Sequence, residues 1–263
     1  MVTPARMISL SRHPTETSTD RFSVMLAHFA FLAPQTQEPR SILCRVLDGR
    51  GLEGECVADA AILTEEERAH YRATLKNPKA AALAMRTRAE LRRMLARETG
   101  LAAHKVPIFC DAHGKPHCPH PGAADLDFSV SHTDECAIIA LGEAAGIGVD
   151  VEQVLEEEPS EENIEILFNE EEFQAWAALP TEQRRLAFTE SWTIKEALLK
   201  ANGMGLDGDT HEVTVRFDES GHAWPVLPSS RWIFERIRFC PRYAASFVAM
   251  MPGEELPTKR LAA

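Results

Sequence analysis

The chain has 263 residues, and its 28 Lys and Arg against 40 Asp and Glu give a formal net charge of −12 at pH 7. Hydrophobic residues make up 44% and charged residues 26%, a globular balance that excludes a disordered or fibrous chain. No apolar run reaches the roughly 18 residues of a membrane-spanning helix, and residues 1–20 lack the apolar core of a secretory signal. The six cysteines form no CxxC pair, so we expect free thiols, a cytoplasmic protein and no membrane role.

Charge is distributed unevenly along the chain. From Arg68 to Lys105, ten basic residues stand against two acidic ones, whereas the segment from Asp150 to Glu190 has thirteen carboxylates against two arginines. A basic block in an acidic protein favours a compact anionic ligand over nucleic acid, because the overall negative field repels a long polyanion. A solvated helix face rich in arginine is the alternative. The acidic segment suits a metal cation or a basic partner.

The first predicted elements are strands. After a polar leader, residues 22–34 and 41–49 alternate apolar with small or polar side chains. Thr64 and Glu67 have the spacing of a capping box, which predicts a helix start there. A second helix is predicted over 80–98, where Ala and Arg dominate, and Gly100 ends it. Its buried face is predicted to comprise Ala84, Leu91, Met94 and Leu95.

The remaining elements follow an irregular Pro, Gly and His segment at 106–121. The acidic segment 155–173 is predicted to be helical or loose, and a helix is predicted over 186–202. Strand patterns occur at 126–132, 136–141, 147–152, 212–217, 232–239 and 243–250. Strands and helices thus occur once before about residue 145 and again after it, which permits two similar halves.

The sharpest local motif is Gly-Ile-Gly-Val-Asp-Val-Glu at 146–152. Because side chains alternate along a strand, Asp150 and Glu152 should lie on one face while Val149 and Val151 face the core. Two carboxylates this close repel each other unless a cation or a proton lies between them. Mg²⁺ is bound by one or two carboxylates together with substrate phosphates, so the spacing suits this ion. An exposed acidic strand end is the alternative.

A second motif, Trp-Thr-Ile-Lys-Glu-Ala-Leu-Leu-Lys at 192–200, lies on the predicted helix. Glu196 and Lys200 are four residues apart and therefore share a helix face. Taken alone they are an ordinary helix ion pair. Beside Asp150 and Glu152 they would supply a third carboxylate and a cation for a phosphate.

Two weaker features could bind phosphate. Lys115 and Pro116 lie in a Gly-Lys-Pro turn, and Ser131 and His132 end a strand, where a hydroxyl, an imidazole and backbone N–H groups can face an anion. The cysteines and histidines at 110, 113, 117, 118 and 120 match no common zinc spacing. Adjacent strand residues point to opposite faces and no nucleophile elbow is present, so we also set a serine hydrolase aside.

The motifs GKP, SVSH, GVDVE and WTIKEALLK occur in this order and together resemble the Sfp-type 4′-phosphopantetheinyl transferases. Both signature motifs of that family, G-V-D-x-E and W-x-x-K-E-A-x-x-K, are complete at 148–152 and 192–200. The resemblance is clear from about residue 63 to 206 and holds in outline in the outer strands. Within the basic block, several arginines compete for the family's cationic positions.

The resemblance implies an α+β fold of two similar α/β halves related by a pseudo-twofold, with the cofactor site between them. The halves would be residues 1–145, with the basic coenzyme A-binding block, and residues 146–263, with the metal site and the W-x-x-K-E-A helix. Because one chain holds both halves, we expect a monomer.

The resemblance also implies transfer of the 4′-phosphopantetheine arm of coenzyme A to a serine of an apo acyl or peptidyl carrier protein, with release of adenosine 3′,5′-bisphosphate. Asp150, Glu152 and Glu196 would hold Mg²⁺, for which Mn²⁺ could substitute, and Glu196 would also be the catalytic base. Trp192 and Lys195 are expected to be a core anchor and a helix-surface cation. The expected coenzyme A contacts are Arg68, Arg72, Arg88, Lys115, Pro116, Ser131, His132 and Lys200, with Arg88 and His132 near the 3′-phosphate.

Two other functions stay open on the residues alone. A Mg²⁺-dependent phosphohydrolase would use the same carboxylates and would release phosphate from coenzyme A without a carrier protein. A binding module would sense coenzyme A or chaperone a carrier protein without catalysis. Neither nucleic acid nor a membrane is an expected partner, and carriers of fatty-acid, polyketide and nonribosomal-peptide pathways are all candidate substrates.

Overall fold

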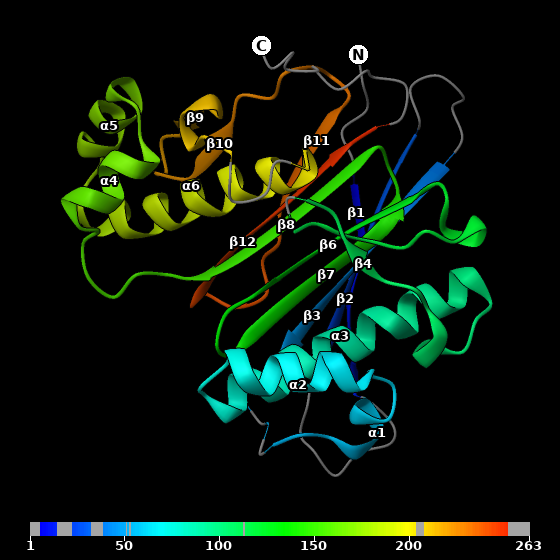
Figure 1. Ribbon diagram of the computed structural model, residues 1–263. Coiled ribbons are helices and arrows are strands. Elements are labelled where there is room, and N and C mark those ends of the chain that lie inside the picture. Colours follow the sequence, from blue (N-terminus) through cyan, green and yellow to red (C-terminus); the bar gives the residue numbers. More distant parts are fainter. Residues whose placement is uncertain are drawn as a thin grey trace, which may run out of the picture.

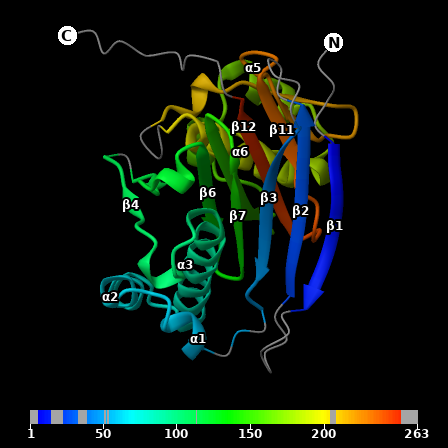
Figure 2. The same ribbon diagram turned by 90° about the vertical axis from the view of Figure 1, so that its right-hand side faces the viewer.

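A computed structural model describes residues 6–14, 23–32, 39–50, 52, 54–112, 114–203 and 208–251. Two β-sheets pack face to face, and a long helix covers the outer face of each, so the fold is mixed α/β in four layers (Figures 1 and 2). No helix in these ranges is both long enough and apolar enough to cross a bilayer. Three parts of the predictions lie outside the described residues, namely Phe22 and residues 33–34 of a strand and His113 of the His and Cys segment.

The larger sheet has five antiparallel strands in the order β1, β2, β3, β7, β6. Helix α3 (Pro78–Thr99) packs on one of its faces, where Leu83, Leu91 and Leu95 join a buried cluster with residues of β7. The short helices α1 (Val57–Ala60) and α2 (Glu65–Thr74) pack against α3. The strand bounds are Arg6–Pro14 for β1, Ser23–Leu32 for β2, Pro39–Asp48 for β3, Cys136–Glu143 for β7 and Leu126–His132 for β6.

The smaller sheet has three antiparallel strands in the order β11, β12, β8, namely Trp232–Arg236, Tyr243–Met250 and Gly146–Gln153. Helix α6 (Thr181–Ala201) covers its outer face, with Ile194 and Leu198 packed in one cluster with Val248. The helices α4 (Glu161–Leu167) and α5 (Glu170–Ala177) lie near α6, as does the hairpin of β9 (Val215–Phe217) and β10 (Ala223–Pro225) (Figure 1).

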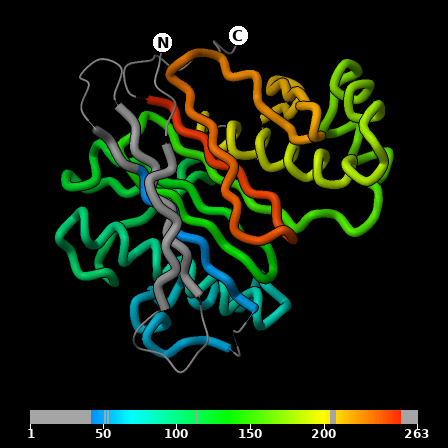
Figure 3. Tube along the Cα trace, turned by 180° about the vertical axis from the view of Figure 1, so that it is seen from behind, coloured from blue at the N-terminus to red at the C-terminus, as the bar shows by residue number. Residues whose placement is uncertain are grey.

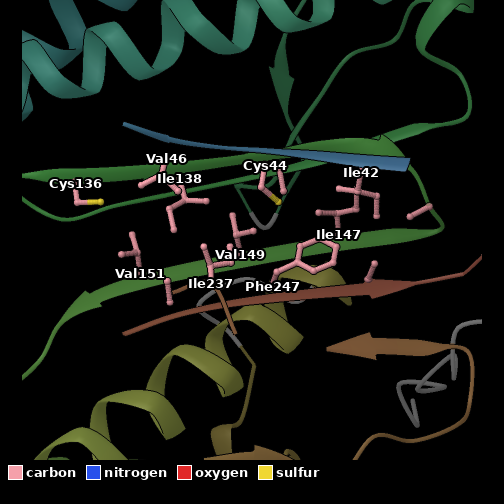
Figure 4. Close-up of a cluster of buried hydrophobic side chains, with 14 of the residues drawn as sticks. Ile42, Cys44, Val46, Cys136, Ile138, Ile147, Val149, Val151, Ile237 and Phe247 are labelled. Carbon is pink, nitrogen blue, oxygen red and sulfur yellow. The ribbon is translucent and has the colours of Figure 1, made fainter. Parts of the chain in front are cut away.

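Between the sheets lies a continuous apolar core (Figure 4). Ile42 and Ile138 from the larger sheet are fully buried in one cluster with Val149, Val151 and Phe247 from the smaller one. Burial of an aliphatic side chain of this size stabilises a fold by about 1.5 to 3 kcal/mol. The expected inward face of Val149 and Val151 is thus confirmed. Seen from behind, the orange and red strands β11 and β12 of the smaller sheet run side by side (Figure 3).

Local sequence signals define the helix ends as predicted. Thr64 Oγ1 accepts from the N–H of Glu67 at 3.2 Å, and the Glu67 carboxylate accepts from the N–H of Thr64 at 3.0 Å, so the capping box is confirmed. Helix α3 begins after Asn77, whose side chain accepts from the N–H of Lys79. It ends at Gly100, which has φ of +70°, a left-handed conformation that glycine adopts at little cost.

Several predicted boundaries are wrong. The polar leader contains β1, whose pairing with β2 is a long-range contact that local alternation does not encode. The strand predicted at 212–217 is limited to 215–217, because Asp209 caps a short 3₁₀ turn at Thr210–Glu212. The irregular segment 106–121 holds the two-residue strands β4 (Phe109–Cys110) and β5 (Pro116–His117), and 3₁₀ turns flank it at Ala103–Lys105 and Pro121–Ala123.

Lys195 is not a surface cation, and this prediction is wrong. Its side chain is fully buried, and its ammonium donates to Glu172 Oε2 at 2.8 Å and to Leu167 O at 2.7 Å. Burial lowers the pKa of Lys195, although the neighbouring Glu172 carboxylate opposes this effect. Glu172 also accepts from the N–H of Val215 at 2.8 Å, so the pair fastens α5 and β9 to α6. Trp192 lies half-buried against the same core, as expected of an anchor.

Much of the basic block is paired inside the fold. Arg86 and Arg93 contact Asp59 at 3.2 and 2.6 Å, and Arg88 and Arg92 contact Glu67 at 2.6 and 2.9 Å. Burial raises the pKa of Glu67, but hydrogen bonds from Arg92 and Arg88 outweigh it, so the net shift is downward. These ion pairs hold α1 and α2 against α3. The solvated arginine face therefore does not describe Arg86 and Arg92, which are buried.

Candidate active site

The site forms where α6 lies directly against β8. Gly146, Gly148 and Asp150 share one face of β8 because side chains alternate. A Cβ on Gly148 would lie 1.7 Å from Ala197 O, and one on Gly146 would lie 2.3 Å from Ala201 O. Only glycine at these positions allows the helix backbone to come so close, and this approach brings the end of α6 to Asp150.

Asp150 is the centre of the site. Its side chain is buried, with 3% of the residue exposed. Its Oδ1 accepts from Lys200 Nζ at 2.6 Å and from Ser131 Oγ at 2.8 Å. Its Oδ2 is buried and has no hydrogen-bond partner among the described residues. Because a buried carboxylate oxygen without a partner is costly, Oδ2 is the natural ligand for a cation.

Glu152 and Glu196 flank Asp150, and both have raised pKa values. Burial raises the pKa of Glu152 to about 7, the charge of Asp150 adds to this, and that of Lys200 opposes it. Burial also raises the pKa of Glu196, which the charge of Lys200 partly offsets and that of Asp150 reinforces. A cation bound among these three carboxylates would reduce the repulsion between their charges.

A cavity of about 210 Å³ opens beside Glu152. It is lined by Glu152 and by the apolar side chains of Leu155, Phe188 and Trp192, so it runs toward the first turns of α6. Such an apolar wall excludes water from one side of Glu152, which is consistent with the raised pKa of that carboxyl.

The donor set suits a hard divalent cation. Mg²⁺ prefers carboxylate oxygens, keeps several waters and needs only one or two protein carboxylates. Across the described ranges, no three carboxylate, imidazole or thiolate side chains are already gathered into a ligand cage. The unpartnered Asp150 Oδ2 and the two raised pKa values nevertheless fit an ion that completes its shell with substrate oxygens.

Three of the predicted coenzyme A contacts lie on β5, β6 and the turn before them. Lys115 donates to Asp127 Oδ2 at 2.6 Å and to Ile147 O at 3.4 Å, so it lies along β8 near its first residues. Pro116 begins β5 and pairs with Cys110. His132 ends β6, and its pKa is lowered by loss of water contact and by the charge of Lys200, which places it near the site.

The three candidate arginines lie on α2 and α3, and each has a carboxylate partner. Arg68 pairs with Glu65, and Arg72 contacts Glu55 at 2.6 Å on the surface. Arg88 contacts Glu67 through Nε, and a guanidinium has further donors on its Nη atoms. No contact among the described residues joins these arginines to Asp150, so they belong to a separate, basic part of the molecule.

Sequence reasoning missed several residues that build the site. Asp127 and Ser129 of β6 accept hydrogen bonds from backbone N–H groups of β8. Glu172 forms an ion pair with Lys195. The polar residues 127, 129 and 131 alternate along the predicted strand, a signal that was visible. Such alternation ordinarily indicates a solvent-facing side of a sheet, so it pointed away from an internal contact.

Comparisons with known proteins identify the region around this site. The family model of the 4′-phosphopantetheinyl transferase superfamily matches residues 146–248. The 4′-phosphopantetheinyl transferase HetI of Nostoc sp. is 32% identical over 117 residues, which are 44% of this chain and 49% of that protein. The enzyme psf-1 of Bacillus pumilus is 27% identical over 129 residues, 49% of this chain and 53% of psf-1. Sfp of Bacillus subtilis is 26% identical over 140 residues, 53% of this chain and 60% of Sfp.

The chain thus spans about half the length of the curated relatives that it matches. The matched family region begins with the glycines of β8 and contains Asp150, Glu152, Glu196 and Lys200. The resemblance to the Sfp-type enzymes is confirmed at the level of the family. Residues 146–248 of this chain therefore match the 4′-phosphopantetheinyl transferase superfamily.

Proposed function

We propose that this protein transfers the 4′-phosphopantetheine arm of coenzyme A to a serine of an apo acyl or peptidyl carrier protein and releases adenosine 3′,5′-bisphosphate. The observation that carries the proposal is the buried, unpartnered Oδ2 of Asp150 beside Glu152, Glu196 and Lys200, within the matched family region. This is the arrangement that a pyrophosphate and a divalent cation require, since transfer of this type depends on positioning and on neutralising phosphate charge.

In this proposal, Asp150, Glu152 and Glu196 hold Mg²⁺ or Mn²⁺, which neutralises charge on the pyrophosphate when bound. Lys200 holds Asp150 through Nζ at 2.6 Å and is close enough to share its charge with a phosphate oxygen. The serine oxygen forms the new bond to the β-phosphorus while the bond to the α-phosphate breaks. The bisphosphate leaves with that electron pair.

Glu196 is the proposed acceptor of the serine proton, directly or through a water. Its raised pKa makes it a better base than an ordinary carboxylate. A bound cation lowers its basicity, which favours late proton transfer over full deprotonation of the serine. Glu196 lies one turn before Lys200 on α6, so base and phosphate contact are held by the same rigid helix.

The coenzyme A contacts are proposed along β6, the Gly-Lys-Pro turn and the basic helices. Lys115 and Pro116 would line the nucleotide, and His132 with Arg88 would bind the 3′-phosphate. Arg68 and Arg72 are proposed as further contacts at the edge of that surface. Ser131 lies in the same place, but its hydroxyl already binds Asp150.

The proposals for domain organisation, oligomeric state and cellular compartment follow from the resemblance. Residues 1–145 and 146–263 would be two similar halves related by a pseudo-twofold, with coenzyme A between them and both halves in one monomer. Support comes from the repeated arrangement of a sheet with a long helix on its outer face. All six cysteines are free thiols, which supports a reducing compartment such as the cytoplasm.

The test is to incubate the protein with coenzyme A, Mg²⁺ and a panel of apo carrier proteins from fatty-acid, polyketide and nonribosomal-peptide pathways, and to read intact carrier mass. A mass gain of one phosphopantetheine that is lost in Asp150→Ala supports the proposal. Phosphate release from coenzyme A without a carrier would indicate a phosphohydrolase. Binding of coenzyme A without either reaction would indicate a binding module.

Glu196→Gln separates the two roles given to this residue. We expect coenzyme A affinity to change less than about tenfold, or about 1.4 kcal/mol. Transfer should fall by at least roughly a hundredfold, the scale of lost general-base help. A collapse of affinity with a near wild-type rate at saturation would show that Glu196 is a ligand only.

A further inference from the structure

Strand β8 lies at the edge of the smaller sheet, and its outer edge is paired with side chains instead of a neighbouring backbone. The N–H groups of Ile147, Val149 and Val151 point to this edge, because alternate residues of a strand direct their backbone groups the same way. All three donate to side chains of β6. The acceptors, in order, are Asp127 Oδ2 at 2.5 Å, Ser129 Oγ at 3.1 Å and Ser131 Oγ at 3.3 Å. We call these three contacts the edge ladder.

Carbonyl groups on the same edge accept from lysines. Lys115 Nζ donates to Ile147 O at 3.4 Å, and Lys200 Nζ donates to Val149 O at 3.3 Å. Side chains therefore satisfy this edge where the two sheets meet, and Asp150 lies within the laddered stretch. The position of the Asp150 carboxylate thus depends on β6, which precedes the matched family region.

Ser129 and Ser131 are a matched pair with one difference. Both are buried, with 4% and 7% of the residue exposed, and each accepts from one N–H of β8. Ser131 also donates its hydroxyl proton to Asp150 Oδ1 at 2.8 Å. A hydroxyl has a single proton to donate, so Ser131 in this arrangement has none for a phosphate of coenzyme A.

The geometry points to Ser131 as a positioning residue for Asp150, an inference that rests on the proposed function. The N–H of Val151 fixes the serine oxygen, and the serine proton in turn fixes Asp150 Oδ1. Lys200 occupies the same carboxylate oxygen at 2.6 Å. Both donors therefore bind Oδ1, which leaves the buried Oδ2 as the oxygen that can bind a cation. Ser131 acts on the metal ligand and not on coenzyme A.

The test compares Ser131→Ala with Ser129→Ala. Each variant leaves one N–H of β8 without its acceptor, so their structural costs are matched, and only Ser131→Ala loses the contact to Asp150. Mn²⁺ binding is titrated by the electron paramagnetic resonance signal of free Mn²⁺, with coenzyme A present and no carrier protein. Loss of a group that orients a metal ligand costs about tenfold or more in metal affinity. We expect that loss in Ser131→Ala and less than about twofold in Ser129→Ala.

A second readout is the KM for coenzyme A at saturating Mg²⁺, which should stay unchanged in both variants. Equal loss of Mn²⁺ affinity in the two variants would overturn the inference, because the edge ladder would then be structural only. A raised KM with unchanged Mn²⁺ affinity in Ser131→Ala would also overturn it and would make Ser131 a coenzyme A contact. If Ser131→Ala does not fold, Ser131→Cys keeps the shape of the side chain with a weak donor and carries the same expectation against Ser129→Cys.

These measurements separate a failure of the proposed function from a failure of the role of Ser131. Wild-type protein that neither binds Mn²⁺ nor modifies any carrier would remove the proposed function. Wild-type protein that does both, with indistinguishable serine variants, would remove only the role of Ser131.

Discussion

Replacing Gly148 with alanine should force α6 away from β8. The added Cβ would lie 1.7 Å from Ala197 O and 2.8 Å from Ala201 N, and both are backbone atoms of the helix. No truncation of a helix side chain can relieve a contact with backbone. The φ of Gly148 is not positive, so the conflict is one of space and not of backbone conformation.

The cost can be estimated from this contact. Overpacking in a core costs typically 1 to 3 kcal/mol, and a backbone neighbour places Gly148→Ala at about 3 kcal/mol or above. The helix must retreat by roughly 1 Å, a displacement that can cost about a hundredfold in rate when it misplaces reacting groups. Lys200 and Glu196 both move with α6, so the 2.6 Å contact of Lys200 with Asp150 should be lost.

Urea unfolding and carrier modification on the same preparation measure both effects. Gly54→Ala is the control, because a Cβ at Gly54 meets nothing within 4 Å in the described part of the chain. We expect the control to match the wild type in stability and transfer. A Gly148→Ala variant that unfolds within about 0.5 kcal/mol of wild type and transfers at a similar rate would refute the close approach of α6 to β8.

Three further outcomes are expected. Lys195→Met should destabilise the fold by about 3 to 5 kcal/mol, because Glu172 is left buried and unpaired. The double variant with Lys195→Met and Glu172→Gln should recover most of this free energy of unfolding, as measured by urea unfolding. No recovery in the double variant would contradict the pairing. Burial raises the pKa of Glu152 to about 7, above its ordinary 4.5. The stability of chelator-treated protein should therefore fall as pH rises from about 5 through 7, because the folded state loses a proton that it holds more tightly than the unfolded state. Glu152→Gln should flatten this pH profile of stability. Dephospho-coenzyme A should bind more weakly than coenzyme A to the wild type but much less so to Arg88→Ala and His132→Ala; equal discrimination in all three would place the 3′-phosphate elsewhere.

Local patterns were sufficient to predict the parts of the fold that depend on neighbours in sequence. The capping box of Thr64 and the end of α3 at Gly100 follow from side chains within a few residues. The inward face of Val149 and Val151 follows from strand alternation. In each case the physical cause acts over one turn or one pleat, which a sequence displays directly.

The failures share a different cause, since their partners are distant in sequence. Lys195 follows a helical pattern that fits either face, and its burial depends on Glu172, which is 23 residues away. The solvated arginine face fails for Arg86 because its partner Asp59 lies outside the basic block, where a local charge pattern does not include it. The link between β6 and β8 joins residues 20 apart through side chains, a contact that alternation alone assigns to solvent.

The internal pairing of α3 also determines how an anion would be captured from solution. At physiological salt, charges are screened beyond about 8 Å, and an arginine already neutralised at contact distance adds little to the field outside that range. Arg86 and Arg93 share Asp59, and Arg88 and Arg92 share Glu67, so about half of their positive charge is offset at contact distance, within a chain of net charge −12. Diffusional steering of a phosphate-rich molecule is therefore weak. Its capture depends on groups that touch it once it has arrived.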